Sequence, residues 1–188
     1  MGAAEVPLAM PLAGLADAVD SFPSPPRTPD PRPVAARRFD FLWGSWTVRN
    51  RTLVDRLADS QEWREWDATL DVIPILGGMG SVDRFRAERD GASYEGVTVR
   101  LFDPTTERWS MYWMDDRGLR LTPQVGGPME DWGGEFHGAE EFRGDTVALR
   151  FRWTHPTAGT ARWEQAYQRA DGTWEVNWTM EFTRPRGG

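Results

Sequence analysis

The feature that most constrains this chain is an alternation of apolar and polar residues that recurs between residues 46 and 182. In the segment 174–182 the alternation places Trp174, Val176, Trp178, Met180 and Phe182 on one face of a strand, with polar side chains on the other. No segment shows helical periodicity over three turns. The pattern therefore predicts an all-β fold.

Turn sequences separate the alternating segments at short intervals, which favours hairpins between neighbouring strands. The expected strands are 46–54, 61–72, 81–88, 94–102, 109–115, 119–124, 135–142, 146–154, 161–168 and 174–182. Sequential hairpins are typical of an antiparallel up-and-down β-barrel, here of about 8–10 strands, more than of a sandwich.

The first part of the chain has a different composition from the rest. Eight of the 14 prolines fall within the first 33 residues, and proline-rich sequence forms neither regular helix nor a central strand. We expect residues 1–37 to be a disordered or extended Pro-rich tail, with a short helical turn near residues 12–19. Residues 38–186 are then a single barrel domain.

Composition excludes several classes of function. With 22 basic and 29 acidic residues the net charge is −7, which argues against a nucleic-acid partner. There is no cysteine, so disulfides and thiolate chemistry are excluded. No apolar run is long enough for a membrane helix and no signal peptide is evident, so a cytoplasmic protein without a membrane partner is expected. The spacing of His137 and His155 gives no support to a metal site, and no cofactor is expected.

The segment RFDFLWGSWTV, residues 38–48, places a Gly-x-Trp step at the start of the first strand. This step resembles the Gly-x-Trp of lipocalins and the wider calycin group. The resemblance implies that Trp46 plugs the closed end of a barrel, that Arg184 covers it, and that Phe39 and Phe41 lie beneath it.

A wider resemblance covers residues 39–184. The segments FDFLWGSW, YEGVTVRLFDPTTERWSMYW, GEFHGAEEF, LRFRW, ARWEQAY and DGTWEVNW together resemble an uncharacterised bacterial family of lipocalin-like domains. That resemblance implies a lipocalin-like barrel and does not specify an activity.

Polar residues on apolar strand faces are candidates for a ligand site. Asn50 and Thr52 have the parity of Trp46, and Gln165 has the parity of Trp163 and Tyr167, so all should point inward. Inward polar groups need hydrogen-bond partners, which a ligand can supply. With two aromatic wall residues, the predicted lining is Asn50, Thr52, Trp66, Trp113, Gln165 and Tyr167.

Other polar residues lie on the strand face opposite a row of apolar residues. Arg100, Arg150, Arg152 and Asn177 are therefore expected on the outer surface, unless the polar face of the strand lines the cavity. The sequence leaves that inversion open.

His137 and Glu135 are two residues apart and should share one strand face. Such a pair can act in general acid–base catalysis, and equally can be a hydrogen-bonded surface pair. We keep them as the candidate catalytic residues.

Three functions remain open. The first is a barrel that binds a small, largely apolar or aromatic metabolite in an internal cavity. The second, implied by the calycin resemblance, is a cofactor-independent enzyme that uses the cavity for cyclisation or isomerisation in secondary metabolism. The third is an interaction protein, because several strands are apolar on both faces, which would suit a homodimer.

Overall fold

The computed structural model describes residues 30–89, 91–122, 125–157 and 159–185. Residues 1–29 of the expected tail, including the helical turn near residues 12–19, lie outside the described residues. The boundary at residue 38 between tail and barrel stays a prediction. No helix among the described residues is long and apolar enough to cross a membrane.

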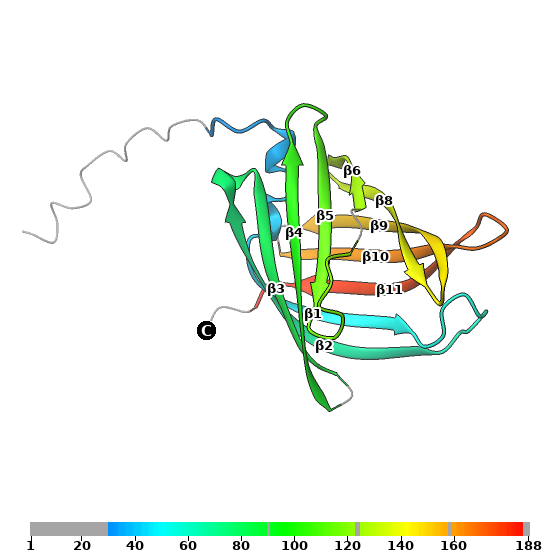
Figure 1. Ribbon diagram of the computed structural model, residues 1–188. Coiled ribbons are helices and arrows are strands. Elements are labelled where there is room, and N and C mark those ends of the chain that lie inside the picture. The colour runs from blue at the N-terminus through cyan, green and yellow to red at the C-terminus, as the bar shows by residue number, and fades with distance from the viewer. Residues whose placement is uncertain (1–29, 90, 123–124, 158, 186–188) are drawn as a thin grey trace, which may run out of the picture. The chain divides into compact units, whose positions relative to one another are not determined.

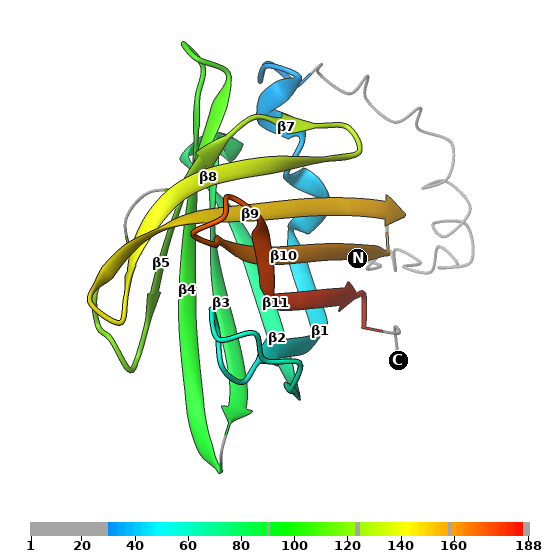
Figure 2. The same cartoon turned by 90° about the vertical axis from the view of Figure 1, so that its right-hand side faces the viewer.

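Ten antiparallel strands close into a ring within the part of the chain that is described (Figures 1 and 2). They are β1 (Gly44–Leu53), β2 (Trp63–Ile75), β3 (Gly80–Arg89), β4 (Ala92–Asp103), β5 (Arg108–Asp115), β6 (Val125–Gly127), β8 (Gly133–Phe142), β9 (Asp145–Thr157), β10 (Thr160–Gln168) and β11 (Trp174–Thr183). The short β7 (Met129–Glu130) pairs only with β8. Each strand pairs with the next along the chain, β1 pairs with β11, and β6 meets β8 to close the ring.

The predicted up-and-down barrel is thus confirmed. Nine of the ten expected strands are present, and the prediction for residues 119–124 is wrong over its described part. The chain turns there instead, because Asp115 Oδ1 accepts hydrogen bonds from the backbone N–H groups of Arg117 and Gly118. Leu119 and Leu121 are exposed, and the closing strand begins only at Val125.

The two ends of the barrel differ. At one end lie the 3₁₀ turns η3 (Ala35–Arg37), η4 (Asp40–Leu42) and η5 (Leu76–Gly78), with the start of β1 and the end of β11. At the other lie the β1–β2, β5–β6 and β10–β11 connections (Figure 2). We call the first the closed end and the second the mouth.

A β-bulge divides β11. Gln165 pairs with Trp178 but the next residue, Ala166, pairs with Val176, so Asn177 is an extra residue on β11. A bulge shifts the side-chain parity of its strand by one. The prediction of one continuous apolar face is therefore wrong for Trp174 and Val176. Glu175 and Asn177 are the buried residues of that segment.

Candidate functional site

The closed end is sealed by the aromatic cluster that the sequence places there. Trp46 and Phe39 are each 1% exposed, and Trp46 Nε1 donates to the carbonyl of Leu42 at 2.7 Å. The Phe39 ring lies edge-on to Trp109, with centroids 4.9 Å apart. The prediction that Trp46 and Phe39 plug this end is confirmed.

Arg184 covers the plug as expected. Its guanidinium carbon lies 3.8 Å from the centroid of the Trp46 ring, and Nη2 donates to the carbonyl of Phe41 at 2.7 Å. Gly44 has a φ of 94°, and a Cβ built there would lie 3.0 Å from Arg184 Nη1. Glycine fits this position because a side chain would be strained there and would also crowd the arginine.

Above the plug the barrel encloses a cavity of about 90 Å³. Its aromatic lining consists of Phe85, Trp113, Phe151, Trp153, Trp163, Trp178 and Phe182. Its polar lining consists of Asp83, Thr98, Arg100, Thr122, Glu140 and Gln165. Sites that enclose drug-sized ligands measure roughly 300–1,000 Å³, so this cavity suits a molecule of about one ring.

Trp178 is the centre of the aromatic wall. Its ring centroid lies 5.8 Å from that of Trp66, 6.5 Å from that of Trp113 and 5.5 Å from that of Trp163. The Trp113 indole packs over Gly96 of β4, which lies two residues from its register partner Thr98: a Cβ built at Gly96 would lie 2.0 Å from the indole. The indole therefore occupies the space that a side chain at position 96 would take.

The predicted polar residues form the frame behind these rings. The inward orientation of Asn50 and Thr52 is confirmed, as they are 0% and 3% exposed. Asn50 Oδ1 accepts from Trp178 Nε1 at 3.0 Å, and Thr52 Oγ1 accepts from Trp66 Nε1 at 3.4 Å. These bonds fix the orientations of two indoles, so Asn50 and Thr52 support the wall rather than line the cavity.

Gln165 and Trp113, in contrast, line the cavity itself. Gln165 Nε2 donates to Asn177 Oδ1 at 2.9 Å, which ties the cavity wall to the bulge. Asn177 is fully buried, so the expectation that it lies on the surface is wrong.

A buried ion pair forms the polar part of the cavity floor. Arg100 Nη1 donates to Asp83 Oδ2 at 2.6 Å, and the side chains are 4% and 0% exposed. Asp83 Oδ1 accepts from the backbone N–H of Thr98 at 2.8 Å. The expectation of an exposed Arg100 is wrong, because β4 turns its polar face inward and its valines outward. The other two arginines expected on the surface, Arg150 and Arg152 of β9, are half-buried.

The sequence contains a signal for this pair. Asp83 has the parity of Phe85, and Arg100 that of Phe102, so two aromatic residues already indicated the inner face of β3 and β4. Ion pairing across these strands follows from their register, in which Asp83 stands opposite Thr98.

Two buried tyrosines bond to carboxylates near the mouth. The Tyr167 hydroxyl donates to Glu140 Oε1 at 2.6 Å and accepts from Arg56 at 3.0 Å. The Tyr94 hydroxyl donates to Asp115 Oδ2 at 3.2 Å. Burial, then the adjacent carboxylate, raises the pKa of each phenol well above its usual range.

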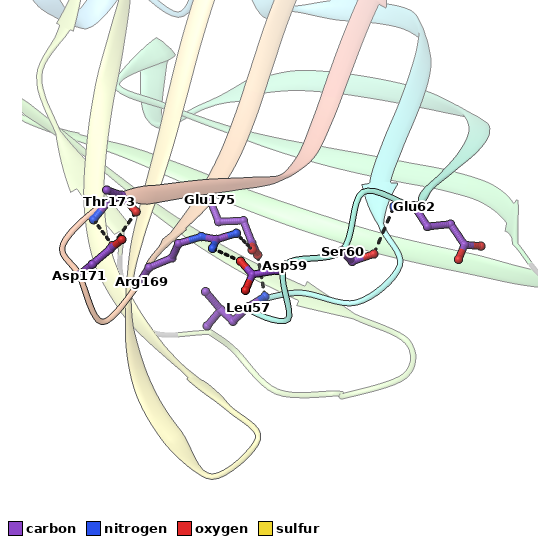
Figure 3. Close-up of polar contacts among 8 residues, drawn as sticks. All are labelled: Leu57, Asp59, Ser60, Glu62, Arg169, Asp171, Thr173 and Glu175. Atoms are coloured by element: carbon purple, nitrogen blue, oxygen red, sulfur yellow. Dashed lines mark hydrogen bonds and ion pairs between the residues drawn. The ribbon is translucent and has the colours of Figure 1, made fainter.

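The β1–β2 connection is tied to the β10–β11 hairpin at the mouth (Figure 3). Glu175 Oε1 accepts from the backbone N–H of Leu57 at 2.7 Å, and Glu175 Oε2 accepts from Arg169 Nη2 at 2.6 Å. Arg169 also pairs with Asp59. A buried carboxylate with these two partners holds this loop in one position.

The candidate catalytic pair lies elsewhere. His137 Nε2 and Glu135 Oε1 are 3.0 Å apart on the outer face of β8, with side chains 53% and 37% exposed. Partial burial acts to raise the pKa of Glu135, but the hydrogen bond from Arg152 and the charge of Arg150 outweigh it, so this pKa is lowered. The pair meets as predicted, away from the cavity, and its catalytic role stays a prediction.

Fold and site together define a lipocalin-like barrel with a closed aromatic floor and a small internal cavity. Two solved structures are similar to it. An S-type phycobiliprotein lyase, CPES from Guillardia theta, superposes with a TM-score of 0.57 at 12% identity, covering 85% of this chain and 97% of that one. Rv2717c from M. tuberculosis gives a TM-score of 0.52 at 13% identity, with coverages of 82% and 99%. No protein-family model and no curated protein matches the chain.

Proposed function

We propose that the barrel binds a small, largely apolar or aromatic metabolite in its internal cavity. The observation that carries the proposal is the enclosed aromatic cavity, in whose wall the Trp178 indole is held by a hydrogen bond to Asn50. A filled core needs no such cavity, whereas an oriented aromatic wall with a few polar groups is what small-molecule sites share.

The first test is native mass spectrometry of the purified protein, followed by denaturing extraction. A co-purifying small molecule supports the proposal and reveals its chemistry. The second test is the melting temperature with ethylbenzene as a neutral, ring-sized probe. A ligand at about 100 times its Kd stabilises by about 2.7 kcal/mol, which for a chain of this length is about 5–10 °C.

A variant whose cavity is filled distinguishes binding in the cavity from binding to the protein surface. In Gly96→Ala the new methyl group would collide with the Trp113 indole, which lines the cavity, so the ethylbenzene shift should disappear. Gly159→Ala is the matched control, because a Cβ there meets nothing within 4 Å. A wild-type protein that gives no shift, or a shift that survives Gly96→Ala, would contradict the proposal.

The second candidate is an enzyme that uses the same cavity. One similar structure is by its name a lyase, which supports enzymatic use of such a barrel, and two carboxylates, Asp83 and Glu140, line the cavity. A compound recovered by extraction and converted on re-addition would favour this candidate. Loss of turnover in His137→Ala would favour the predicted catalytic pair.

A homodimer stays a further prediction. On the outer face Ile73, Val82, Val99 and Tyr112 stand in direct register across β2–β5, an apolar row suited to a second copy of the chain. Sedimentation equilibrium of wild type and Val99→Glu tests it: a dimer that the substitution dissociates supports this face, and a monomeric wild type rejects it.

A further inference from the structure

Two residues that line the cavity carry buried hydrogen-bond donors that the described residues leave unpaired. Arg100 Nε and Trp153 Nε1 are both buried and have no hydrogen-bond partner among those residues. Arg100 and Trp153 are each 3% exposed and both line the cavity. The Arg100 guanidinium carbon lies 5.7 Å from the centroid of the Trp153 ring, so the two donors belong to one neighbourhood.

The chemistry of these groups selects an acceptor. An indole N–H donates only, and a guanidinium donates only. A buried donor without a partner is costly, by about 1–3 kcal/mol in proteins, so an oxygen atom of a bound molecule would be stabilised here. The indole of Trp178, on the cavity wall, differs in this respect, since it donates to Asn50.

The charge of the floor selects against an anion. Arg100 is already neutralised by Asp83 at 2.6 Å, and Asp83 has no other cation in contact among the described residues. A carboxylate would add a second negative charge beside Asp83 in a site shielded from water, where desolvation is expensive. A neutral carbonyl oxygen accepts from the same donors without that cost.

We propose that the ligand is a neutral aromatic carbonyl compound, whose oxygen accepts hydrogen bonds from Arg100 and Trp153 while its ring lies against Trp163 and Trp178. This inference rests on the proposed function and adds the ligand class to it. The volume of about 90 Å³ limits the buried part to one ring, seated by small shifts of the surrounding side chains.

The experiment compares three one-ring probes by NMR titration of the full chain at pH 7: acetophenone, ethylbenzene and benzoate. We expect acetophenone to bind about 10-fold more tightly than ethylbenzene, because its oxygen pairs the buried donors. Benzoate should bind more weakly than acetophenone by a similar factor. If no probe binds, the proposed function itself fails.

If ethylbenzene binds as tightly as acetophenone, or benzoate binds most tightly, the carbonyl inference is overturned while the binding function stands. Trp153→Phe removes one donor and keeps the charge, so the acetophenone-to-ethylbenzene preference should fall several-fold. A ratio is used because the smaller ring changes the binding of both probes. An unchanged ratio would remove Trp153 from the inference.

Asp83→Asn tests the charge argument directly. Without its carboxylate, Arg100 is left with no anionic partner, so benzoate should now bind more tightly than acetophenone. Arg84→Gln is the matched control, because Arg84 neighbours Asp83 but lies exposed on the outer face, paired with Glu95. It should leave all three affinities unchanged. If Asp83→Asn leaves the order of the three probe affinities unchanged, the proposed role of the ion pair is contradicted.

Discussion

Single side chains determine how this barrel is closed and how its interior tolerates polar groups. Arg184 spans the seam between β1 and β11 by bonding to the carbonyls of Phe41 and Ser45 while its guanidinium stacks on Trp46. Burial lowers the pKa of Arg184, yet an arginine stays charged at any physiological pH. The charged guanidinium of Arg184 therefore adds a cation–π contact to the packing of Trp46.

Arg184→Ala should reduce the free energy of unfolding by about 1–2 kcal/mol, because a cation–π contact and hydrogen bonds to two carbonyls are lost. Chemical denaturation measures the change. Arg184→Lys keeps the charge but not the planar fork, so it should recover only part of the loss. Equal stability of wild type and Arg184→Ala would show that Trp46 seals the floor alone.

The two buried tyrosines predict a loss of stability at alkaline pH. Folding raises the pKa of Tyr94 and Tyr167 above the unfolded value of about 10. Their contribution is therefore complete below about pH 10 and is lost as pH rises toward the raised pKa values. Denaturation curves between pH 8 and 11.5, with phenolate absorbance, measure it.

The double variant Tyr94→Phe, Tyr167→Phe is the control for this pH dependence. Its stability should fall less steeply above pH 10 than that of the wild type. An equal slope would assign the alkaline loss to other groups.

At the level of elements, sequence alternation identified nearly every strand but could not assign every face. The alternation of inward and outward side chains breaks at the β-bulge of β11, where Asn177 is an extra residue. It also left the face of β4 open, because Val97, Val99 and Leu101 alternate with Tyr94, Thr98 and Arg100, and both sets contain apolar residues. The parity of Phe102, which is buried, marks the set that points inward.

The connection between β1 and β2 depends on one buried carboxylate (Figure 3). Glu175→Ala removes the acceptor of the Leu57 N–H, so hydrogen exchange of that amide should become at least about 10-fold faster, which corresponds to a loss of about 1.4 kcal/mol in local stability. Glu175→Gln keeps an acceptor oxygen and should retain more protection. Protection that persists in Glu175→Ala would mean that Arg169 and Asp59 suffice to hold the loop.

For the whole molecule, the resemblance of Gly44-Ser45-Trp46 predicted the barrel and its closed end, whereas the site depended on contacts distant in sequence. The lining residue Gln165 could be inferred from parity, but the Asp83–Arg100 pair required the register of β3 with β4. The sequence also did not predict which strands close the ring. The closing strand β6 is only three residues long, and it pairs with β8 only at Gly126 and His137.

This short seam should be the least stable part of the ring. Native-state hydrogen exchange is expected to show β6 amides opening locally, with little dependence on denaturant, whereas β1 and β11, paired over Thr47–Thr52, exchange only on global unfolding. Protection of β6 equal to that of β1 would contradict a weak seam.

The contact of one indole with three others has a spectroscopic consequence. Trp178 lies within 6.5 Å, centroid to centroid, of Trp66, Trp113 and Trp163, so their electronic transitions are coupled. The far-ultraviolet circular dichroism of the folded barrel should therefore contain an exciton couplet superimposed on the β-sheet signal. Because the couplet depends on the mutual angles of the rings, a molecule that enters among them and turns one indole will change it, without any added dye.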